Sequence, residues 1–268
     1  MTEALFKIEG ASFLPTSLAG SPWHPDVLHG GAPAGLLAFC LEREVEGSGL
    51  QPAKLSIDLL RPVPKASLSV KVRTLRKGKR ILLLAATLQA GDSVVAEATC
   101  LFIKPQMITL PEFAYRETPS IEAPHGVQEV SFRDILFGSS GDLPPGLHTT
   151  IQLRPVTTLN ERGRGIAWVA LPVSIVSGHS NTPFMLAALA ADFGNGVGQL
   201  RLGENMGTIN VDIILQLSRL PDGDWIGIDS VALMDEMGIG QVTTTLHDIH
   251  GRIGQVSQTI MPMGEYGG

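Results

Sequence analysis

The sequence predicts an α+β fold in which two similar units follow each other along the chain, each a buried helix wrapped by an antiparallel sheet. Three observations support this prediction. The predicted helix at 181–196 and the first two turns of the one at 33–45 are apolar on nearly every side, and a helix with that pattern must have protein all around it. Strand-like segments that alternate apolar and polar residues follow each helix. The two halves also match in order, since Pro183 and Asp192 lie 150 residues after Pro33 and Glu42.

The composition places the chain among globular proteins and excludes several functions. Of its 268 residues 44% are hydrophobic, which is enough for one large domain or two ordinary ones. The net charge of −6 argues against a nucleic-acid partner. We expect no secretory signal and no membrane insertion, because residues 1–10 alternate in polarity and no apolar run is long enough to span a bilayer. Cys40 and Cys100 lie in apolar runs, which favours reduced, buried thiols and a cytoplasmic location.

The first predicted unit covers residues 1–104. A possible short strand in residues 4–14 and a Gly- and Pro-rich loop precede the helix at 33–45. Ala90-Gly91-Asp92 is a hairpin signal between two of the strands that follow. The predicted strands of this unit are 54–60, 67–75, 80–89 and 93–104.

Residues 105–147 are rich in Pro and Gly, and we predict a linker with little regular structure apart from a short helix at 132–137. The second unit is predicted at residues 148–268. Its turn at His250-Gly251 matches the hairpin of the first unit. The predicted strands are 150–156, 165–171, 207–217, 225–233, 240–248 and 252–261.

The helix at 181–196 contains one ionisable residue, Asp192. We expect Ser180 or Asn181 to cap its start, Pro183 to lie in its first turn, and Gly194-Asn195-Gly196 to end it. A carboxylate in the last turn faces the negative end of the helix dipole. Unless Asp192 is simply exposed at a frayed helix end, it therefore needs hydrogen-bond donors or a chemical role.

Each predicted sheet would curl around its helix and leave one edge strand open. Pairing the two sheets edge to edge would cover those edges and give one continuous sheet, which is the arrangement of a double hotdog fold. We expect the chain to form a homo-oligomer as well, because other sheet edges would stay open.

Seven short motifs follow one another along the chain: His29-Gly30-Gly31, Leu60-Arg61-Pro62, residues 74–78 (TLRKG), 151–156 (IQLRPV), 191–193 (ADF), 207–209 (GTI) and 256–258 (VSQ). They resemble the acyl-CoA thioesterase II family and occur in the family's order, and the resemblance covers most of the chain outside the linker. The resemblance implies an enzyme of lipid metabolism that hydrolyses a fatty or related acyl-CoA to free acid and CoA, without a metal or other cofactor.

In that family an Asp, a Thr and a Gln of the second half hold the hydrolytic water. The motifs carry these roles to Asp192, Thr208 and Gln258, and the pattern of the buried helix had already singled out Asp192. The matching positions in the first half are Glu42, Lys54 and Ala98, which lack a hydroxyl and an amide. We therefore expect one active site per chain, in the second half.

Substrate contacts are predicted on both sides of this site. The backbone N–H groups of Gly30 and Gly31 are candidates to stabilise the developing oxyanion. The side chains expected to line the acyl tunnel are those of Phe184, Met185 and Leu189.

Two other functions stay open. After Thr-Ile the family usually has an acid and a His, and after Gln often Glu-Gly, whereas this chain has Asn210-Val211 and Thr259-Ile260. Such changes are compatible with an acyl-CoA-binding protein that does not turn over its ligand. A hydratase or dehydratase of the same fold would need a His in the tunnel, so His29 or His179 within reach of Asp192 would favour it.

Simpler structural roles are also open for these residues. Thr208 suits any strand because it is β-branched, Gln258 suits a solvent-facing strand position, and histidines are common in surface loops. The basic run at residues 73–80 is interpreted as a solvated hairpin or, alternatively, as a contact for the phosphates of CoA.

Overall fold

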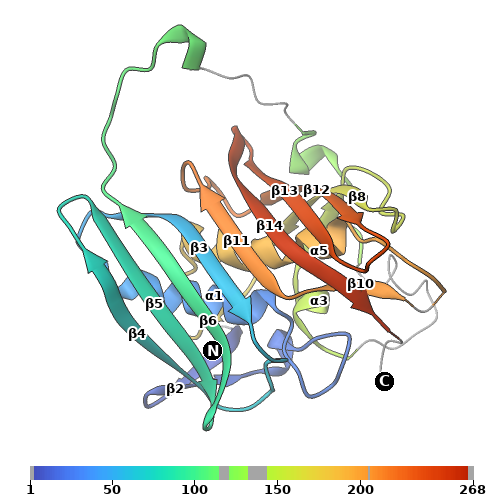
Figure 1. Cartoon of the computed structure of the whole chain (residues 1–268), viewed down its shortest axis with the longest axis horizontal. Coiled ribbons are helices and arrows are strands. Elements are labelled where there is room, and N and C mark those ends of the chain that lie inside the picture. Colours follow the sequence, from blue (N-terminus) through green and yellow to red (C-terminus); the bar gives the residue numbers. More distant parts are fainter. Residues whose placement is uncertain (1–2, 115–120, 132–143, 205, 265–268) are drawn as a thin grey trace.

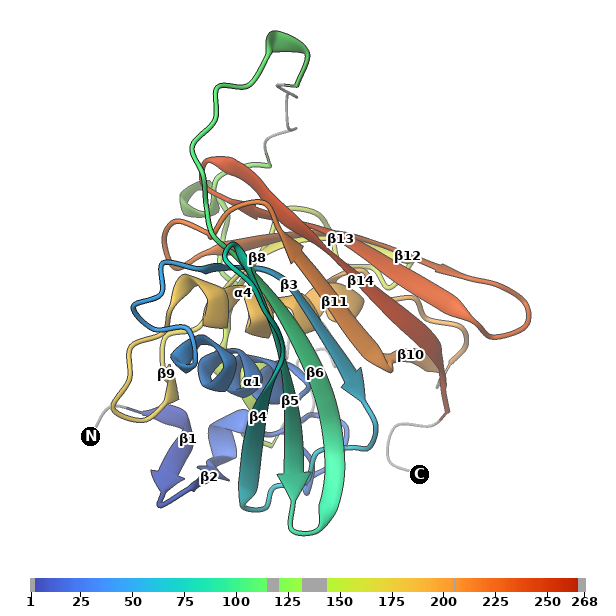
Figure 2. The ribbon, with the colours of Figure 1, turned by 60° about the vertical axis from the view of Figure 1, so that its left-hand side comes forward.

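The computed structural model describes residues 3–114, 121–131, 144–204 and 206–264. Within these ranges fourteen strands form one sheet, which curves over the two main helices (Figure 1, Figure 2). The strands lie in the order β7-β8-β12-β13-β14-β11-β3-β6-β5-β4-β2-β1-β9, and β10 pairs with β14 beside this path. The protein therefore has the predicted double hotdog fold.

The first unit contains the predicted four-stranded meander, with strand ends that differ from the prediction by a few residues. The N-terminal segment forms a hairpin of two strands instead of one, because Gly10 turns the chain with a φ of 61°. Gly91 turns the predicted hairpin with a φ of 57°. The strands are β1 (Ala4–Glu9), β2 (Ser12–Pro15), β3 (Gln51–Leu59), β4 (Leu68–Lys77), β5 (Ile81–Ala90) and β6 (Ser93–Ile103).

The second unit differs from its prediction in two places. The strand predicted at 207–217 is broken at Val211 into β10 and β11, which both pair with β14. A short strand that was not predicted, β9, pairs in parallel with β1 of the first unit. The strands are β7 (Gln152–Pro155), β8 (Arg164–Ala170), β9 (Ser174–Val176), β10 (Gly207–Asn210), β11 (Asp212–Leu217), β12 (Ile226–Met234), β13 (Gly240–Asp248) and β14 (Gly251–Met263).

The two units meet where β3 pairs with β11 in antiparallel register, as the open sheet edges predicted. Ile57 lies opposite Ile213, and both side chains are buried. Asp58 lies opposite Asp212. These two residues are also counterparts in the sequence repeat, since they are 154 residues apart, as are Lys54 and Thr208. A residue paired with its own counterpart indicates an approximate two-fold axis at this point of the seam.

Helices α1 (Gly31–Arg43) and α4 (Pro183–Ala190) pack against each other under the concave face of the sheet (Figure 2). Every side chain of α4 from Phe184 to Ala190 is buried. Each helix in the described ranges is too short or too polar to cross a membrane. The short helices are η1 (Ser17–Ala19), η2 (Glu112–Ala114), η3 (Pro124–Gly126), α3 (Leu147–Thr150), η4 (Ala191–Phe193) and α5 (Gly194–Val197).

Both predicted ends of the second long helix are wrong. Its N-cap is Thr182, whose hydroxyl accepts a hydrogen bond from the Met185 N–H at 3.2 Å. Asn181 is not available as a cap, because its side-chain oxygen accepts from the Ile175 N–H at 2.7 Å. Gly194 does not end the helical path, which continues as η4 and α5. A Cβ at Gly194 would lie 2.7 Å from Oε1 of Gln258, so this glycine allows close packing.

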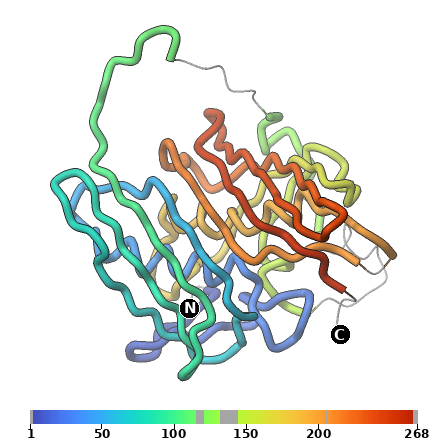
Figure 3. Tube along the Cα trace, in the orientation of Figure 1, coloured from blue at the N-terminus to red at the C-terminus, as the bar shows by residue number. Residues whose placement is uncertain are grey.

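After β6 the chain extends away from the sheet (Figure 3). The described residues 121–131 then lie against the second unit. There the Trp168 indole N–H donates to the Glu122 carbonyl at 2.7 Å, and the Arg154 guanidinium donates to the Pro124 carbonyl at 2.8 Å. The helix predicted at 132–137 lies outside the described residues, and the unit boundaries at 104 and 148 stay a prediction.

An ion pair ties the loop after β11 to the β13–β14 turn. The Arg219 guanidinium donates to both carboxylate oxygens of Asp248, and the backbone N–H groups of Asp222 and His250 donate to the same carboxylate. Burial by itself would raise the pKa of Asp248, but these hydrogen bonds and the charge of Arg219 lower it to about 2. The folded state is therefore stabilised by the ionised form of Asp248.

We predict that Asp248→Asn lowers the free energy of unfolding at pH 7 by about 1–2 kcal/mol, a range that allows for the solvent exposure of Arg219. Because the folded-state pKa is below the unfolded one, this contribution is present above about pH 4 and is lost as the pH falls towards 2. Urea unfolding of wild type and variant from pH 7 to pH 2 measures it. Asp235→Asn, in the exposed β12–β13 turn, is the control, and an equal loss in both variants would contradict the prediction.

Candidate active site

A cavity of about 710 Å³ lies where the start of α1 approaches η4 and α5. Both units contribute to its wall, so neither could form it alone. The first unit supplies the loop before α1 and the segment after β3, while the second supplies the helix end, β10 and the end of β14. The lining residues are Ser21, Pro22, Trp23, His24, Val27, Leu28, His29, Gly30, Leu59, Leu60, Arg61, Pro62, Val63, His148, Asp192, Phe193, Asn195, Gly196, Gln199, Thr208, Ile209, Asn210, Val211, Met261 and Met263.

Asp192 lies in η4 at the wall of this cavity and is 7% exposed. Both of its carboxylate oxygens have partners. The Asn210 side-chain amide donates to Oδ1 at 3.1 Å, and Nδ1 of His29 lies 2.9 Å from Oδ2. The donors that an acid at a helix C-terminus requires thus come from β10 and from the other unit.

His29 precedes α1, and its ring lies flat on the ring of Phe193, with centroids 4.7 Å apart and an angle of 21°. The backbone N–H of Gly31 also points at Nδ1 and donates to it at 3.2 Å. Two lone pairs facing each other at 2.9 Å would repel, so the contact between Nδ1 and the Asp192 carboxylate requires a proton, which either group can carry. Among the described residues Nε2 of His29 has no hydrogen-bond partner.

The approach of the two units here requires glycine. A Cβ at Gly30 would lie 2.7 Å from Oδ1 of Asp192, and one at Gly31 would lie 2.9 Å from the Leu189 carbonyl oxygen. Gly30 is the N-cap of α1 and offers no side chain to its first turn. The start of a 13-residue helix, with its positive dipole end, therefore lies at the cavity beside Asp192.

Thr208 and Gln258 are connected to each other through Asn195, a residue that the sequence analysis did not identify as part of the site. The Thr208 hydroxyl donates to Oδ1 of Asn195 at 2.9 Å, and the Asn195 amide donates to the Thr208 carbonyl at 3.0 Å. The Asn195 backbone N–H donates to Oε1 of Gln258 at 3.1 Å. The Gly-Asn-Gly pattern predicted a helix end and so concealed this role.

The structure brings Asp192 and Thr208 to the cavity wall but not Gln258, which is fully buried behind Asn195. Phe184, Met185 and Leu189 do not line the cavity either. They lie in the core, where the rings of Phe184 and Phe102 pack edge to face. Their all-apolar helix has protein on every side, so its side chains fill the space under the sheet.

Glu42, the counterpart of Asp192 in the repeat, has different surroundings. The Thr182 hydroxyl donates to its Oε2 at 2.5 Å, so Glu42 holds the residue that caps α4. Burial raises the pKa of Glu42, and the Thr182 hydrogen bond acts in the opposite direction. His179 lies 150 residues after His29 and is its counterpart in the repeat. It is exposed, and its ring packs edge to face against Phe39. This pair of contacts is structural and does not reproduce the His29–Asp192 pair.

The basic run at 73–80 lies far from the cavity. It forms the β4–β5 turn, where Ile81 pairs with Ile103, whereas the cavity lies beyond Leu59 at the other end of β3 and β6. The side chains of residues 73–80 are exposed. This supports the interpretation as a solvated hairpin.

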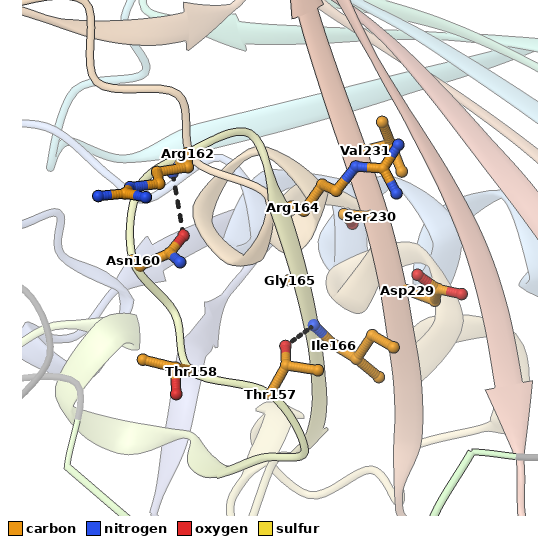
Figure 4. A pocket seen from close by; sticks show the side chains of 10 residues that line it. All are labelled: Thr157, Thr158, Asn160, Arg162, Arg164, Gly165, Ile166, Asp229, Ser230 and Val231. Carbon is orange, nitrogen blue, oxygen red and sulfur yellow. Dashed lines mark hydrogen bonds between the residues drawn. The ribbon is translucent and has the colours of Figure 1, made fainter.

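A second hollow of about 400 Å³ lies along β8 and β12 and contains none of the predicted site residues (Figure 4). In it the N–H of Ile166 donates to the Thr157 hydroxyl, and the N–H of Arg162 donates to the Asn160 side chain. The lining residues are Thr157, Thr158, Asn160, Arg162, Arg164, Gly165, Ile166, Asp229, Ser230 and Val231.

Comparison with known proteins assigns the family. The acyl-CoA thioesterase N-terminal domain matches residues 19–103, and the acyl-CoA thioesterase C-terminal domain matches residues 121–261. These matches cover most of the chain, so the protein belongs to the acyl-CoA thioesterase family, as its motifs implied. A search of the curated proteins finds no match.

Solved structures share the fold at low sequence identity. A candidate thioesterase II from Thermobifida fusca YX superposes with a TM-score of 0.72 at 17% identity, over 98% of this chain and 97% of that one. A hotdog protein of unknown function from Alicyclobacillus acidocaldarius gives 0.71 at 14% identity, over 97% and 96%. The acyl-CoA thioesterase II TesB2 from Mycobacterium marinum gives 0.62 at 13% identity, over 87% and 89%.

We predict that Asn195→Ala lowers the free energy of unfolding by about 1–3 kcal/mol, because it leaves the buried hydroxyl and carbonyl of Thr208 without partners. Urea denaturation measures the loss. The control is Asn160→Ala, whose side chain is exposed and accepts one local hydrogen bond; it should change the value by less than about 0.5 kcal/mol. Similar losses in the two variants would show that the Asn195 side chain does not hold the site together.

Proposed function

We propose that the protein hydrolyses a fatty or related acyl-CoA to the free acid and CoA in the cavity between its two units. The observation that carries this proposal is the buried carboxylate of Asp192, which lies at the cavity wall beside the uncapped start of α1. Membership of the acyl-CoA thioesterase family supports the substrate class. The mostly apolar wall suits an acyl chain.

Thioester hydrolysis needs a water molecule aimed at the carbonyl carbon. In this proposal Asp192 supplies the negative charge that draws a proton from that water, directly or through a partner. Thr208 shares the cavity wall and retains acceptor capacity on its hydroxyl. Gln258 acts indirectly, because it holds the backbone of Asn195, which in turn fixes Thr208.

The oxyanion that forms in the transition state needs donors. Gly30 lines the cavity at the start of α1, where the helix dipole also favours negative charge, so its N–H is the candidate donor. The predicted second donor, the Gly31 N–H, donates to Nδ1 of His29, and Gly31 does not line the cavity. Because the carboxylate comes from the second unit and the Gly30 donor from the first, the reacting carbonyl would lie between them. The Glu42 carboxylate already accepts a hydrogen bond from Thr182, the residue that caps α4. This supports one active site per chain.

Two accompanying properties are also proposals. The chain acts without a resident metal or cofactor in this mechanism, since water and side chains suffice for the step. A homo-oligomer would cover the outer strands of the sheet, β7 and β9. A cytoplasmic location would suit the two free cysteines, Cys40 and Cys100.

A second candidate function has one observation in its favour. His29 lies within hydrogen-bond distance of Asp192. A histidine held in this way can activate water for addition to the double bond of an unsaturated acyl-CoA as well as for attack on a thioester carbonyl. A hydratase would consume the double bond of an enoyl-CoA and release no thiol, so the two reactions are separable in one assay.

We predict that wild type releases thiol from members of an acyl-CoA panel that runs from short to long chains and includes an aromatic acyl group. Asp192→Asn should reduce this rate by about 100-fold or more, because the amide cannot carry the negative charge. Glu42→Gln, which alters the matching residue of the first unit, should retain most of the activity.

Other outcomes of this panel reject the proposal in defined ways. Loss of the double bond of an enoyl-CoA without thiol release would establish the hydratase. No turnover in any variant, with acyl-CoA still raising the melting temperature, would establish an acyl-binding protein. Activity that survives Asp192→Asn but is lost in Glu42→Gln would place the site in the first unit.

A further inference from the structure

We propose that His29, oriented by Asp192, is the general base that activates the hydrolytic water. This inference rests on the proposed thioester hydrolysis and assigns its proton transfer to a residue of the first unit. The sequence motifs had assigned the water to three residues of the second unit.

The first step of the argument is that the Asp192 carboxylate is already engaged. Its Oδ1 accepts from Asn210 and its Oδ2 faces Nδ1 of His29, and the residue is nearly inaccessible to solvent. Each carboxylate oxygen therefore already has one partner, and a water in the cavity would have to share an oxygen with Asn210 or His29. Its charge can still act through the imidazole.

The second step is that His29 has the position and the fixed orientation of a base. In the proposed state Nδ1 carries the proton of the Asp192 contact and the Gly31 N–H no longer has Nδ1 as its acceptor, which leaves the lone pair of the neutral ring on Nε2. Nε2 has no hydrogen-bond partner in the described part of the chain, and His29 lines the cavity. Stacking on Phe193 holds the ring plane, so little reorientation is needed before proton transfer.

The third step is that the remaining polar residues do not replace this base. Gln258 lies behind Asn195 and does not line the cavity, while the Thr208 hydroxyl already donates to Asn195. Neither side chain can accept a proton as a base of useful strength at neutral pH. Their geometry suits positioning and leaves the base to His29.

The charged and titratable groups around His29 are compatible with this role. Asp192 faces it from η4 and stabilises the imidazolium that forms. His148 faces it from α3, and burial together with the neighbouring His29 lowers the pKa of His148 to about 4, so His148 is neutral at pH 7. Arg61 and His24 also line the cavity, and Lys65 lies near His148.

The reaction balances with these groups alone. Nε2 of His29 takes a proton from water as the water oxygen bonds to the thioester carbonyl carbon. The carbonyl electrons move to the oxygen, which becomes an oxyanion. When that oxygen reforms its double bond, the C–S bond breaks, and the proton on Nε2 passes to the leaving sulfur. The products are the carboxylic acid and the thiol, and His29 is neutral again.

The test is the pH dependence of kcat/KM for thiol release, measured on the best substrate of the panel. We expect His29→Gln to lose about 100-fold or more at neutral pH and to lose the acidic ionisation that limits wild type. The control is His179→Gln. His179 is the counterpart of His29 in the second unit and is exposed, so this variant should keep the wild-type rate and profile. Circular dichroism and melting temperature confirm that each variant is folded.

An NMR measurement tests the same inference without relying on the rate of the reaction. Nitrogen-15 NMR of labelled histidine should show His29 with its proton on Nδ1 in the neutral form, whereas Asp192→Asn should shift the tautomer population. A His29→Gln variant with the wild-type rate and profile, beside an inactive Asp192→Asn, would overturn the role of His29 and leave the hydrolase proposal intact. A neutral His29 protonated on Nε2 would overturn it too. Absence of thiol release in wild type would instead reject the hydrolase proposal itself.

Discussion

The antiparallel pairing of β3 with β11 is the constraint on which the rest of this molecule depends. It joins two sheets into one and fixes the two units about an approximate two-fold axis near Asp58 and Asp212. The helices α1 and α4 under the sheet then pack against each other, and the start of α1 lies beside the C-terminal end of the α4 segment. The cavity exists because of this arrangement, since each unit contributes only part of its wall.

The repeat has left the two helix-end acids in different surroundings. Asp192 faces the cavity, with His29 and Asn210 as its partners, whereas Glu42 binds Thr182 and stabilises the start of α4. A duplicated fold can therefore use one copy of a position for chemistry and the other for structure. The physical difference is the loop before the opposing helix: one brings a histidine onto the acid, and the other brings a threonine.

Much of the fold could be predicted from sequence because its signals are local. The strands of both meanders follow from alternation, the two helices from their apolar composition, and Asp192 from being a lone acid in such a helix. The predictions that failed depended on competition between distant groups. Asn181 was expected to cap a helix but binds the backbone of β9, and Gly194 was expected to end one but makes room for Gln258.

By itself the sequence determined the elements, their doubling and the acid around which a site could form, because side-chain periodicity and composition are properties of short segments. Only the tertiary structure decided which residues share that site. His29 and Asp192 belong to different units, and they meet because the seam brings one helix start to the other helix end and glycine at position 30 permits the approach. The apolar helix pattern indicated that Phe184 is buried but not whether it lines the cavity, and packing places it in the core. Gln258 carries no local signal of burial, and packing places it behind the cavity wall.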